Sequence, residues 1–226
     1  MLRSLTKYDI LFQLKQGFYT VYAILVVIYL LVLFYLPHSV RMPVTAYIIL
    51  NDTSVVGFIF VGALVLLEKQ QNILESLFIT PLELSTYLWS KVLSLSIIAV
   101  LASLIIGILP GGMRENWVAM TLSVILGSSF FTLAGLGVSA RVNTLNQYIV
   151  GIMTAGLIMV APVALYFFIP DLSIIFPVNA AIDLLISTPA TQSVKGIIAD
   201  SAVLILWIIL AFLWAKQQFI KYVIQK

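Results

Sequence analysis

The amino-acid sequence predicts an all-α protein with six transmembrane helices, and three observations lead to this fold class. First, the 226 residues are 62% hydrophobic and only 9% charged, whereas about a quarter of the residues of a soluble domain are charged. Second, the mean hydropathy is +1.13. Third, six apolar segments approach or reach the roughly 20 residues that a helix needs to cross a membrane. We therefore expect a single transmembrane domain over residues 1–226.

The six predicted spans are residues 17–36, 46–67, 92–109, 118–140, 148–169 and 197–215. None of them shows the alternating pattern of a membrane barrel strand, and an open sheet would leave backbone groups unsatisfied in lipid. The first span resembles a signal peptide only superficially, because sixteen residues precede it and no small-x-small cleavage site follows it. We expect an uncleaved membrane helix there.

The distribution of Lys and Arg predicts the orientation of the chain. If both termini are cytoplasmic, nine basic residues lie inside and three outside, which agrees with the positive-inside rule. The inner residues are Arg3, Lys7, Lys15, Lys69, Lys91, Arg141, Lys216, Lys221 and Lys226, and the outer ones are Arg41, Arg114 and Lys195. We therefore expect the N-in, C-in topology that an even number of spans allows.

Composition also excludes several kinds of function. The chain has no cysteine and a single histidine, His38, which rules out disulfides and thiolate sites and argues against a His-based metal site. No clustered basic face suggests nucleic-acid binding. No Gly-x-x-x-x-Gly-Lys-Ser/Thr loop is present, so we expect no nucleotide site in this chain. We expect no catalysis by this chain and no bound metal or cofactor.

The stretch "EKQQNILESLFITPLELSTYLWSK", residues 68–91, is unusually polar for this chain. Ile73, Leu74, Leu77 and Phe78 share one face of a helix, with polar residues largely opposite. This pattern predicts a short amphipathic helix within residues 68–79. It permits two readings, a helix on the inner leaflet or a helix that docks on a protein.

The acids on the polar side favour the protein partner, because Glu68 and Glu75 outnumber Lys69 and lipid-bound helices usually have a basic polar face. The next residues, "TPLE", match a capping box with Thr80 as N-cap, Pro81 at N1 and Glu83 at N3. Ile79 and Leu84 match the accompanying hydrophobic staple. We therefore predict that the next helix begins at Pro81 and continues into the third span.

Residues 50–95 resemble the core signature of ABC-2 type transporter permeases, and most of all the small fluoroquinolone-export permease subunits. The shared features are an acidic residue at the start of the second span, a Gly/Ala-rich stretch, Glu-Lys at its end, then "TPL" and "SK". Gln71-Asn72 stands where many relatives carry a Glu-Gly pair. The resemblance extends loosely to the six-span plan of a type V exporter.

In such permeases the segment between the second and third spans is the coupling helix, which sits in a groove of a separate ATPase subunit. The resemblance therefore implies a coupling role for Glu68, Ile73, Leu74, Glu75, Leu77, Phe78, Thr80, Pro81 and Glu83. It implies two copies of an ATPase that carries ATP and Mg, a second permease subunit that we expect to be identical, and a prokaryotic plasma membrane. Residues 1–16 are expected to form the interfacial connecting helix, with Leu2, Leu5, Tyr8 and Phe12 towards lipid.

Five polar or aromatic residues are candidates for the substrate path. Asn51 and Asp52 lie near the outer end of the second span, where Asp52 either caps a helix opening at Thr53 or contacts a cation or substrate. Tyr19, Tyr22 and Tyr29 recur at near-helical spacing in the first span. They could line a path for apolar cargo, although Tyr19 also suits an interfacial aromatic belt.

Small residues four apart mark close helix contacts. Gly135 with Ser139, and Gly151 with Ala155, form two such pairs, which could pack within one chain or between two chains. In the family that the chain resembles, the first and fifth spans form the contact between permease halves. The resemblance thus makes Gly151 and Ala155 candidates for the dimer contact.

Residues 170–196 are too long for a turn and too apolar for a free loop. Ala180, Ala181, Leu184 and Leu185 form a short apolar helical pattern, which predicts a re-entrant segment or a helix on the outer membrane surface. Taken together, we expect the permease subunit of an ATP-driven exporter of an apolar or amphipathic small molecule. Lipid or peptide cargo, or a non-ABC accessory membrane protein, are the alternatives.

Overall fold

The computed structural model describes residues 1–109, 117–168, 175–186 and 194–224, and every regular element in these ranges is helical. In chain order the elements are α1 (Leu2–Lys15), α2 (Phe18–Tyr35), α3 (His38–Val55), the π-helical segment η1 (Val56–Phe60), α4 (Val61–Gln70), α5 (Ile73–Ile79), α6 (Leu84–Ile108), α7 (Trp117–Arg141), α8 (Leu145–Phe168), α10 (Pro177–Ile186), α11 (Val194–Phe219) and the π-helical segment η3 (Ile220–Ile224). The all-α fold class is therefore confirmed.

Five helices in the described residues are long and apolar enough to cross a membrane: Phe18–Tyr35, His38–Gln70, Leu84–Ile108, Trp117–Arg141 and Val194–Ile224. They contain or largely coincide with the predicted spans 17–36, 46–67, 92–109, 118–140 and 197–215. The predicted span 148–169 falls mainly on α8, apart from residue 169, which lies outside the described residues. That this sixth helix also crosses the membrane stays a prediction.

The helix that contains the second predicted span is much longer than expected. It runs without interruption from His38 to Gln70 over 33 residues, through the wider turn of η1. At this turn η1 and α7 approach closely, because a Cβ on Gly135 would lie 2.8 Å from the carbonyl oxygen of Gly57. Gly135 thus packs within the chain, as one of the two interpretations of this small residue predicted.

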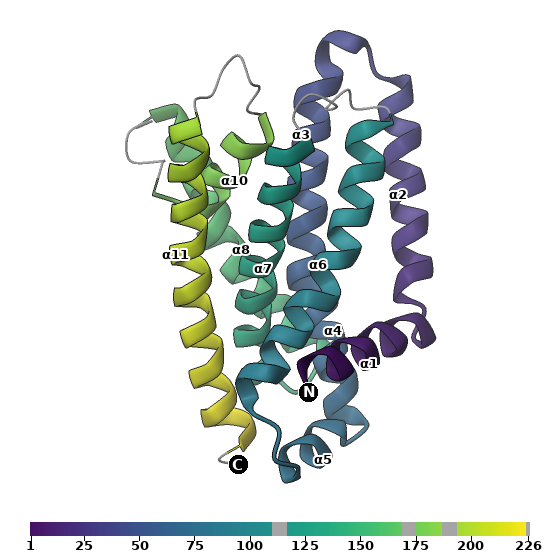
Figure 1. The fold of residues 1–226 in the computed structure, drawn as a ribbon, viewed down its shortest axis with the longest axis vertical. Helices are drawn as coiled ribbons and strands as arrows, with labels where there is room; N and C mark the ends of the chain where they lie inside the picture. The colour runs from purple at the N-terminus through teal and green to yellow at the C-terminus, as the bar shows by residue number, and fades with distance from the viewer. Residues whose placement is uncertain (110–116, 169–174, 187–193, 225–226) are drawn as a thin grey trace.

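Helix α7 is the centre of the bundle and packs against α6, α11, α3, η1 and α4 (Figure 1). Ser128 and Ser96 share a buried hydrogen bond of 2.7 Å between α7 and α6. Because lipid offers helices no strong hydrophobic driving force to associate, small residues and such polar contacts are important for their packing. Exposed apolar side chains cover much of α2 and α11, as expected for helices that face lipid.

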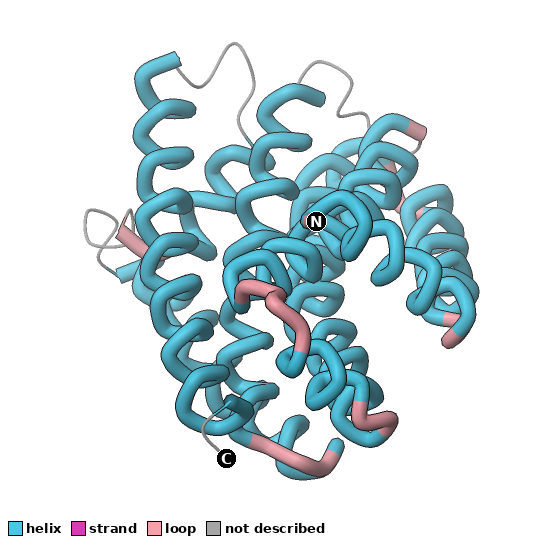
Figure 2. Tube along the Cα trace, turned by 60° about the horizontal axis from the view of Figure 1, so that its bottom comes forward, coloured by secondary structure: helices cyan, strands magenta, loops and turns pink. Residues whose placement is uncertain are grey.

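The two ends of the bundle differ. Helices α1 and α5 and the C-terminus lie at one end, which we call the α5 end, whereas α10 lies near the opposite end (Figure 1). Seen from the α5 end, α1 lies obliquely across the longer helices (Figure 2). Both chain termini are thus on the same side of the bundle, while the side of the membrane that the α5 end faces stays a prediction.

The short apolar helix predicted around residue 180 is present as α10. Its residues Ala180, Ala181, Leu184 and Leu185 are all buried, and α10 packs against α7, α11, α3 and α8. The Ser123 hydroxyl donates to the carbonyl oxygen of Ala181 at 2.8 Å. These contacts favour a segment inserted among the helices over one that lies on the membrane surface. Residues 170–174 and 187–193 of this predicted segment lie outside the described residues.

Candidate functional site

The α5 helix is separated from α4 by a sharp two-residue break. The backbone N–H groups of Gln71 and Asn72 donate to the carbonyls of Leu67 at 3.0 Å and Lys69 at 3.1 Å, which closes α4. Asn72 has φ 56°, a left-handed conformation that few residues other than glycine and asparagine adopt readily. Asparagine therefore suits this turn. The break assigns residues 68–70 of the predicted 68–79 helix to α4.

The predicted capping box at the other end of α5 is wrong. Thr80 closes α5, because its hydroxyl donates to the carbonyl oxygen of Leu77 at 2.5 Å, and its backbone is extended with ψ 160°. Helix α6 begins only at Leu84, with Glu83 as its N-cap residue. The extended backbone of Thr80 fits its position before Pro81, since a proline disfavours helical backbone in the residue before it.

The predicted hydrophobic staple at this junction is absent as well. Ile79 is 86% exposed, whereas Leu84 is buried, so the two side chains do not share a buried contact. Instead, the carbonyl oxygen of Glu83 accepts the N–H groups of Thr86 at 3.0 Å and Tyr87 at 3.2 Å. The Ser85 hydroxyl donates to the Glu83 carboxylate at 3.1 Å. The first bonds of α6 are thus made to Glu83, and no side chain caps the N–H groups at the start of this helix.

The apolar face of α5 is divided between the chain itself and its surroundings. Leu74 is only 2% exposed and belongs to the main hydrophobic core, so most of its surface is covered by this chain. Ile73 and Leu77 are half-buried, and Glu75 is exposed on the same helix. The Phe78 side chain lies outside the described residues. A partner could therefore contact Ile73, Leu77 and Glu75, together with the exposed residues Thr80, Pro81 and Glu83.

Glu68 was expected on the polar surface of the amphipathic helix, and this placement is wrong. Its side chain is 1% exposed and accepts hydrogen bonds from the Lys91 ammonium and, at 2.7 Å, from the Tyr87 hydroxyl. Because Glu68 belongs to α4 and not to α5, it faces α6 instead of the surroundings. Any role in coupling must therefore be indirect.

Lys69 makes a contact that the sequence did not reveal. Its ammonium donates to the backbone carbonyls of Ser139 at 2.9 Å, Ala140 at 3.0 Å and Val142 at 2.8 Å. These carbonyls end α7, where the last carbonyls lack partners within the helix and carry partial negative charge. The cation at the end of α4 thus caps α7. The only sequence signal was a lysine two residues after the end of an apolar span.

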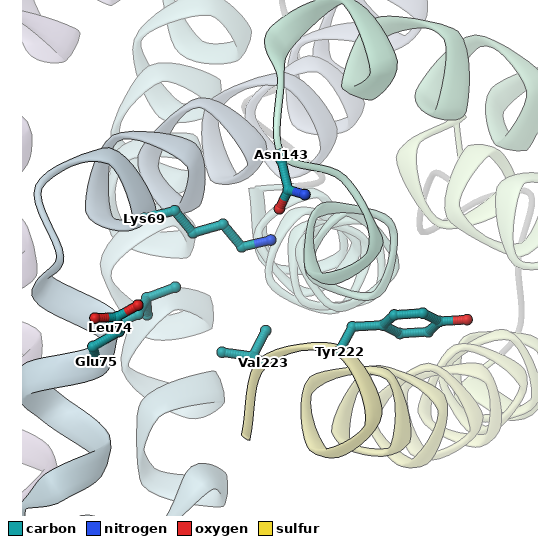
Figure 3. A pocket seen from close by; sticks show the side chains of 6 residues that line it. All are labelled: Lys69, Leu74, Glu75, Asn143, Tyr222 and Val223. Atoms are coloured by element: carbon teal, nitrogen blue, oxygen red, sulfur yellow. The ribbon is translucent and has the colours of Figure 1, made fainter. Parts of the chain in front are cut away.

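A cleft of about 370 Å³ lies beside α5. It is lined by Lys69, Leu74, Glu75, Asn143, Tyr222 and Val223. Figure 3 shows Lys69 extended towards the segment after α7, with Glu75 on one side and the C-terminal residues on the other. The cleft combines an exposed carboxylate with apolar and aromatic walls. It can receive a side chain of a partner, and it extends the surface of α5 to η3.

The five candidate path residues are only partly brought together. The Tyr22 hydroxyl donates to Asp52 Oδ2, which joins α2 to α3, and Asp52 is 2% exposed. Asp52 lies inside α3, so the interpretation that it caps a helix opening at Thr53 is wrong. Asn51 is exposed, and Tyr19 and Tyr29 are half-buried. The substrate role of all five stays a prediction.

The glycine proposed for the dimer contact has a close neighbour in its own chain. A Cβ on Gly151 would lie 2.8 Å from Val138 Cγ1 of α7, and both Gly151 and Ala155 are half-buried. A further contact holds α8 in place, because the Tyr148 hydroxyl donates to the carbonyl oxygen of Phe58. The Gly151 contact within the chain accounts for the small residue, and the dimer contact stays a prediction.

Comparison with known proteins gives consistent matches. The model of the fluoroquinolones export permease protein family matches residues 1–226. Two relatives are the fluoroquinolones export permease proteins of Mycobacterium tuberculosis strains CDC 1551 and H37Rv. Each is 24% identical over 159 residues, which cover 70% of this chain and 67% of the relative.

Proposed function

Because this chain belongs to the fluoroquinolones export permease protein family, we propose that it is the permease subunit of an ATP-binding cassette exporter. Its relatives are named as permeases, which are transport subunits and do not catalyse a reaction. Five apolar helices of spanning length agree with a multi-pass membrane protein. We propose that α8 is the sixth span and that the membrane is the plasma membrane of a prokaryote.

We propose that the α5 end faces the cytoplasm and docks on a separate ATPase. The positive-inside rule supports this orientation, with nine basic residues on the inner side and three on the outer side. The observation that carries the proposal is α5 itself, a short helix between two candidate spans with part of its surface exposed. If a bound partner moves such a helix, the displacement reaches α4 and α6, which adjoin it in the chain.

The complete exporter would contain two copies of this chain and two ATPase subunits that bind ATP and Mg. One six-helix bundle is too small to enclose a wide path, so the path forms between two copies. Tyr22 and Asp52 are buried and join α2 to α3, so we propose that they hold the wall of the path in shape, whereas the exposed Asn51 is a candidate to contact cargo. We propose an apolar or amphipathic drug-like molecule as the cargo, which agrees with the names of the relatives.

The test is reconstitution of the chain in liposomes with a candidate ATP-binding cassette subunit from the same organism. We expect ATP-dependent transport of a fluoroquinolone and co-purification of the two subunits. The matched controls are liposomes with either subunit alone and with an ATPase that cannot hydrolyse ATP. Parallel assays with fluorescent lipids and peptides test the alternative cargoes. ATP-independent transport, or failure of the two proteins to associate, would contradict the proposal.

A further inference from the structure

Three charged side chains from three helices meet in the interior at the α5 end. Asp9 of α1 is 2% exposed, and Glu68 of α4 and Lys91 of α6 are each 1% exposed. The Lys91 ammonium donates to Asp9 Oδ1 at 2.6 Å and also to Glu68 Oε1. The Tyr87 hydroxyl donates to the other oxygen of Glu68 at 2.7 Å. One lysine therefore connects α1 to both helices that flank α5.

A second contact fixes the position of α1 along α6. Gln13 Nε2 donates to Ser94 Oγ at 2.9 Å, and both side chains are buried. Gln13 lies four residues after Asp9, and Ser94 three residues after Lys91, so each pair occupies one face of its helix. Two successive turns of α1 are thus matched to two successive turns of α6, which prevents sliding of one helix along the other.

The residues that α1 buries in the bundle are not those expected for a helix that only anchors the chain in the lipid interface. Phe12, expected towards lipid, is buried together with Asp9 and Gln13, while Leu2 and Tyr8 remain exposed. Burying charged groups is costly even when they are paired, so an ion network of this kind is poor evidence for stability alone. In some proteins such buried charged or polar groups serve to fix one specific geometry.

Asp9, Glu68 and Lys91 form an ion network, and its location indicates which helices it holds together. Glu68 lies next to the end of α4, Lys91 lies near the start of α6, and α5 is the helix between these two. At its other end α1 passes into α2 through Gly17, whose φ of 77° makes a tight turn. Movement of the α4–α5–α6 segment would therefore reach α2 through α1.

We propose that Asp9, Glu68 and Lys91 are positioning residues that make α1 move as one body with α4, α5 and α6 during transport. The inference rests on the proposed function, in which an ATPase pushes α5. It assigns to α1 a mechanical role: this helix carries the displacement of α5 to the first span. An α1 that only anchors the chain in the lipid interface would need no buried connection to Glu68 and Lys91.

The first test uses the absence of cysteine from the chain. In a Gln13→Cys/Ser94→Cys variant the two thiols can be joined by oxidation or by a short bismaleimide, with no background reaction. The chain is reconstituted with its ATPase, and fluoroquinolone transport is measured before and after crosslinking. We expect crosslinked protein to keep at least half of its transport, because α1 and α6 do not separate. Loss of transport on crosslinking, with both single-cysteine variants unaffected by the reagent, would overturn the proposal.

The second test is Asp9→Asn, which weakens the link to α1 but leaves the Lys91–Glu68 pair in place. We expect the amount of drug transported per ATP hydrolysed to fall at least fivefold, with unchanged capture of the ATPase. Lys7→Gln is the matched control, because Lys7 is exposed on the same helix and its replacement alters the charge of α1 without touching the network. An unchanged ratio in Asp9→Asn would overturn the proposal, since a merely structural role lowers the amount of folded protein and not this ratio.

The two proposals fail in different ways. If the wild-type chain does not associate with an ATPase or transport with ATP, the proposed function fails and this inference fails with it. If the wild type transports but Asp9→Asn keeps its ratio, or crosslinking stops transport, only the inference about α1 fails. Should Asp9→Asn not accumulate in the membrane, the crosslinking experiment decides the question alone.

Discussion

Lys69 and Ser139, which are 70 residues apart in the chain, are joined by a hydrogen bond of 2.9 Å from the lysine ammonium to the serine backbone carbonyl. The same ammonium donates to two neighbouring carbonyls, so the end of α4 caps the end of α7. The helix that leads into α5 is thereby attached to the central helix of the bundle. This relationship suggests how the α5 end keeps its shape while a partner acts on it.

Lys69→Met should lower the stability of the α5 end. The methionine retains most of the apolar stem but leaves the α7 carbonyls without a donor, which costs about 1–3 kcal/mol for partly buried groups. The measurement is the midpoint of thermal denaturation in detergent, which we expect to fall by several degrees. Lys216→Met is the control, because Lys216 is exposed on α11. Equal midpoints for the two variants would show that the cap contributes nothing.

Leu77→Asp should prevent the ATPase from binding. Leu77 is half-buried on α5, and an aspartate there would place an unpaired charge in an apolar groove of the partner. Pull-down of the ATPase subunit should lose at least nine-tenths of its yield, while insertion of the permease is unaffected. Leu109→Asp, at an exposed position just after the far end of α6, serves as the control. If Leu77→Asp binds the ATPase normally and transports, α5 is not the docking helix.

Gly62→Ala should destabilise the contact between α4 and α8. A Cβ on Gly62 would collide with the buried ring of Tyr148, and overpacking of this kind costs about 1–3 kcal/mol. Gly156→Ala on α8 is the matched control, because a Cβ there meets no atom within 4 Å. Combining Gly62→Ala with Tyr148→Ala should remove the collision, and a double-mutant cycle of thermal midpoints measures the coupling. Additive effects would mean that the two residues do not touch.

Tyr22→Phe should weaken the connection between α2 and α3. Asp52 Oδ2 accepts the Tyr22 hydroxyl, and Oδ1 is buried without a hydrogen-bond partner, so the substitution leaves the carboxylate unsatisfied. An unsatisfied buried group costs about 1–3 kcal/mol. We expect a lower thermal midpoint and reduced fluoroquinolone transport, and Asp52→Asn should restore part of the midpoint in the double variant. Tyr29→Phe, which removes a half-buried hydroxyl from the same helix, should leave the midpoint within experimental error.

The amino-acid sequence predicted the helical segments well, but it predicted the ends of these helices poorly. The apolar spans could be read from composition and length, because a membrane helix satisfies its own backbone and needs only about 20 apolar residues. At Thr80 the same residues suit either the end of one helix or the start of the next. In the structure Thr80 ends α5, because its hydroxyl donates to the carbonyl oxygen of Leu77, and α6 begins only at Leu84.

The candidate site was predictable in location but not in composition. The polar stretch at residues 68–91 and the family resemblance both directed attention to α5. However, Glu68 was expected to be exposed and is buried, and Leu74 was expected to contact a partner and belongs to the core. The direction of these two side chains depends on the break at Asn72, whose left-handed backbone rotates α5 relative to α4.

The sequence by itself determined that this chain is helical, belongs in a membrane and interrupts its apolar spans with a polar segment near residue 70, because these properties depend on composition and local periodicity. Only the tertiary structure decided that Asp9 meets Lys91 and Glu68, and that Lys69 caps α7. Such pairings join residues far apart in the chain. Each charge could have found several partners, and the packing of the helices in space selected one.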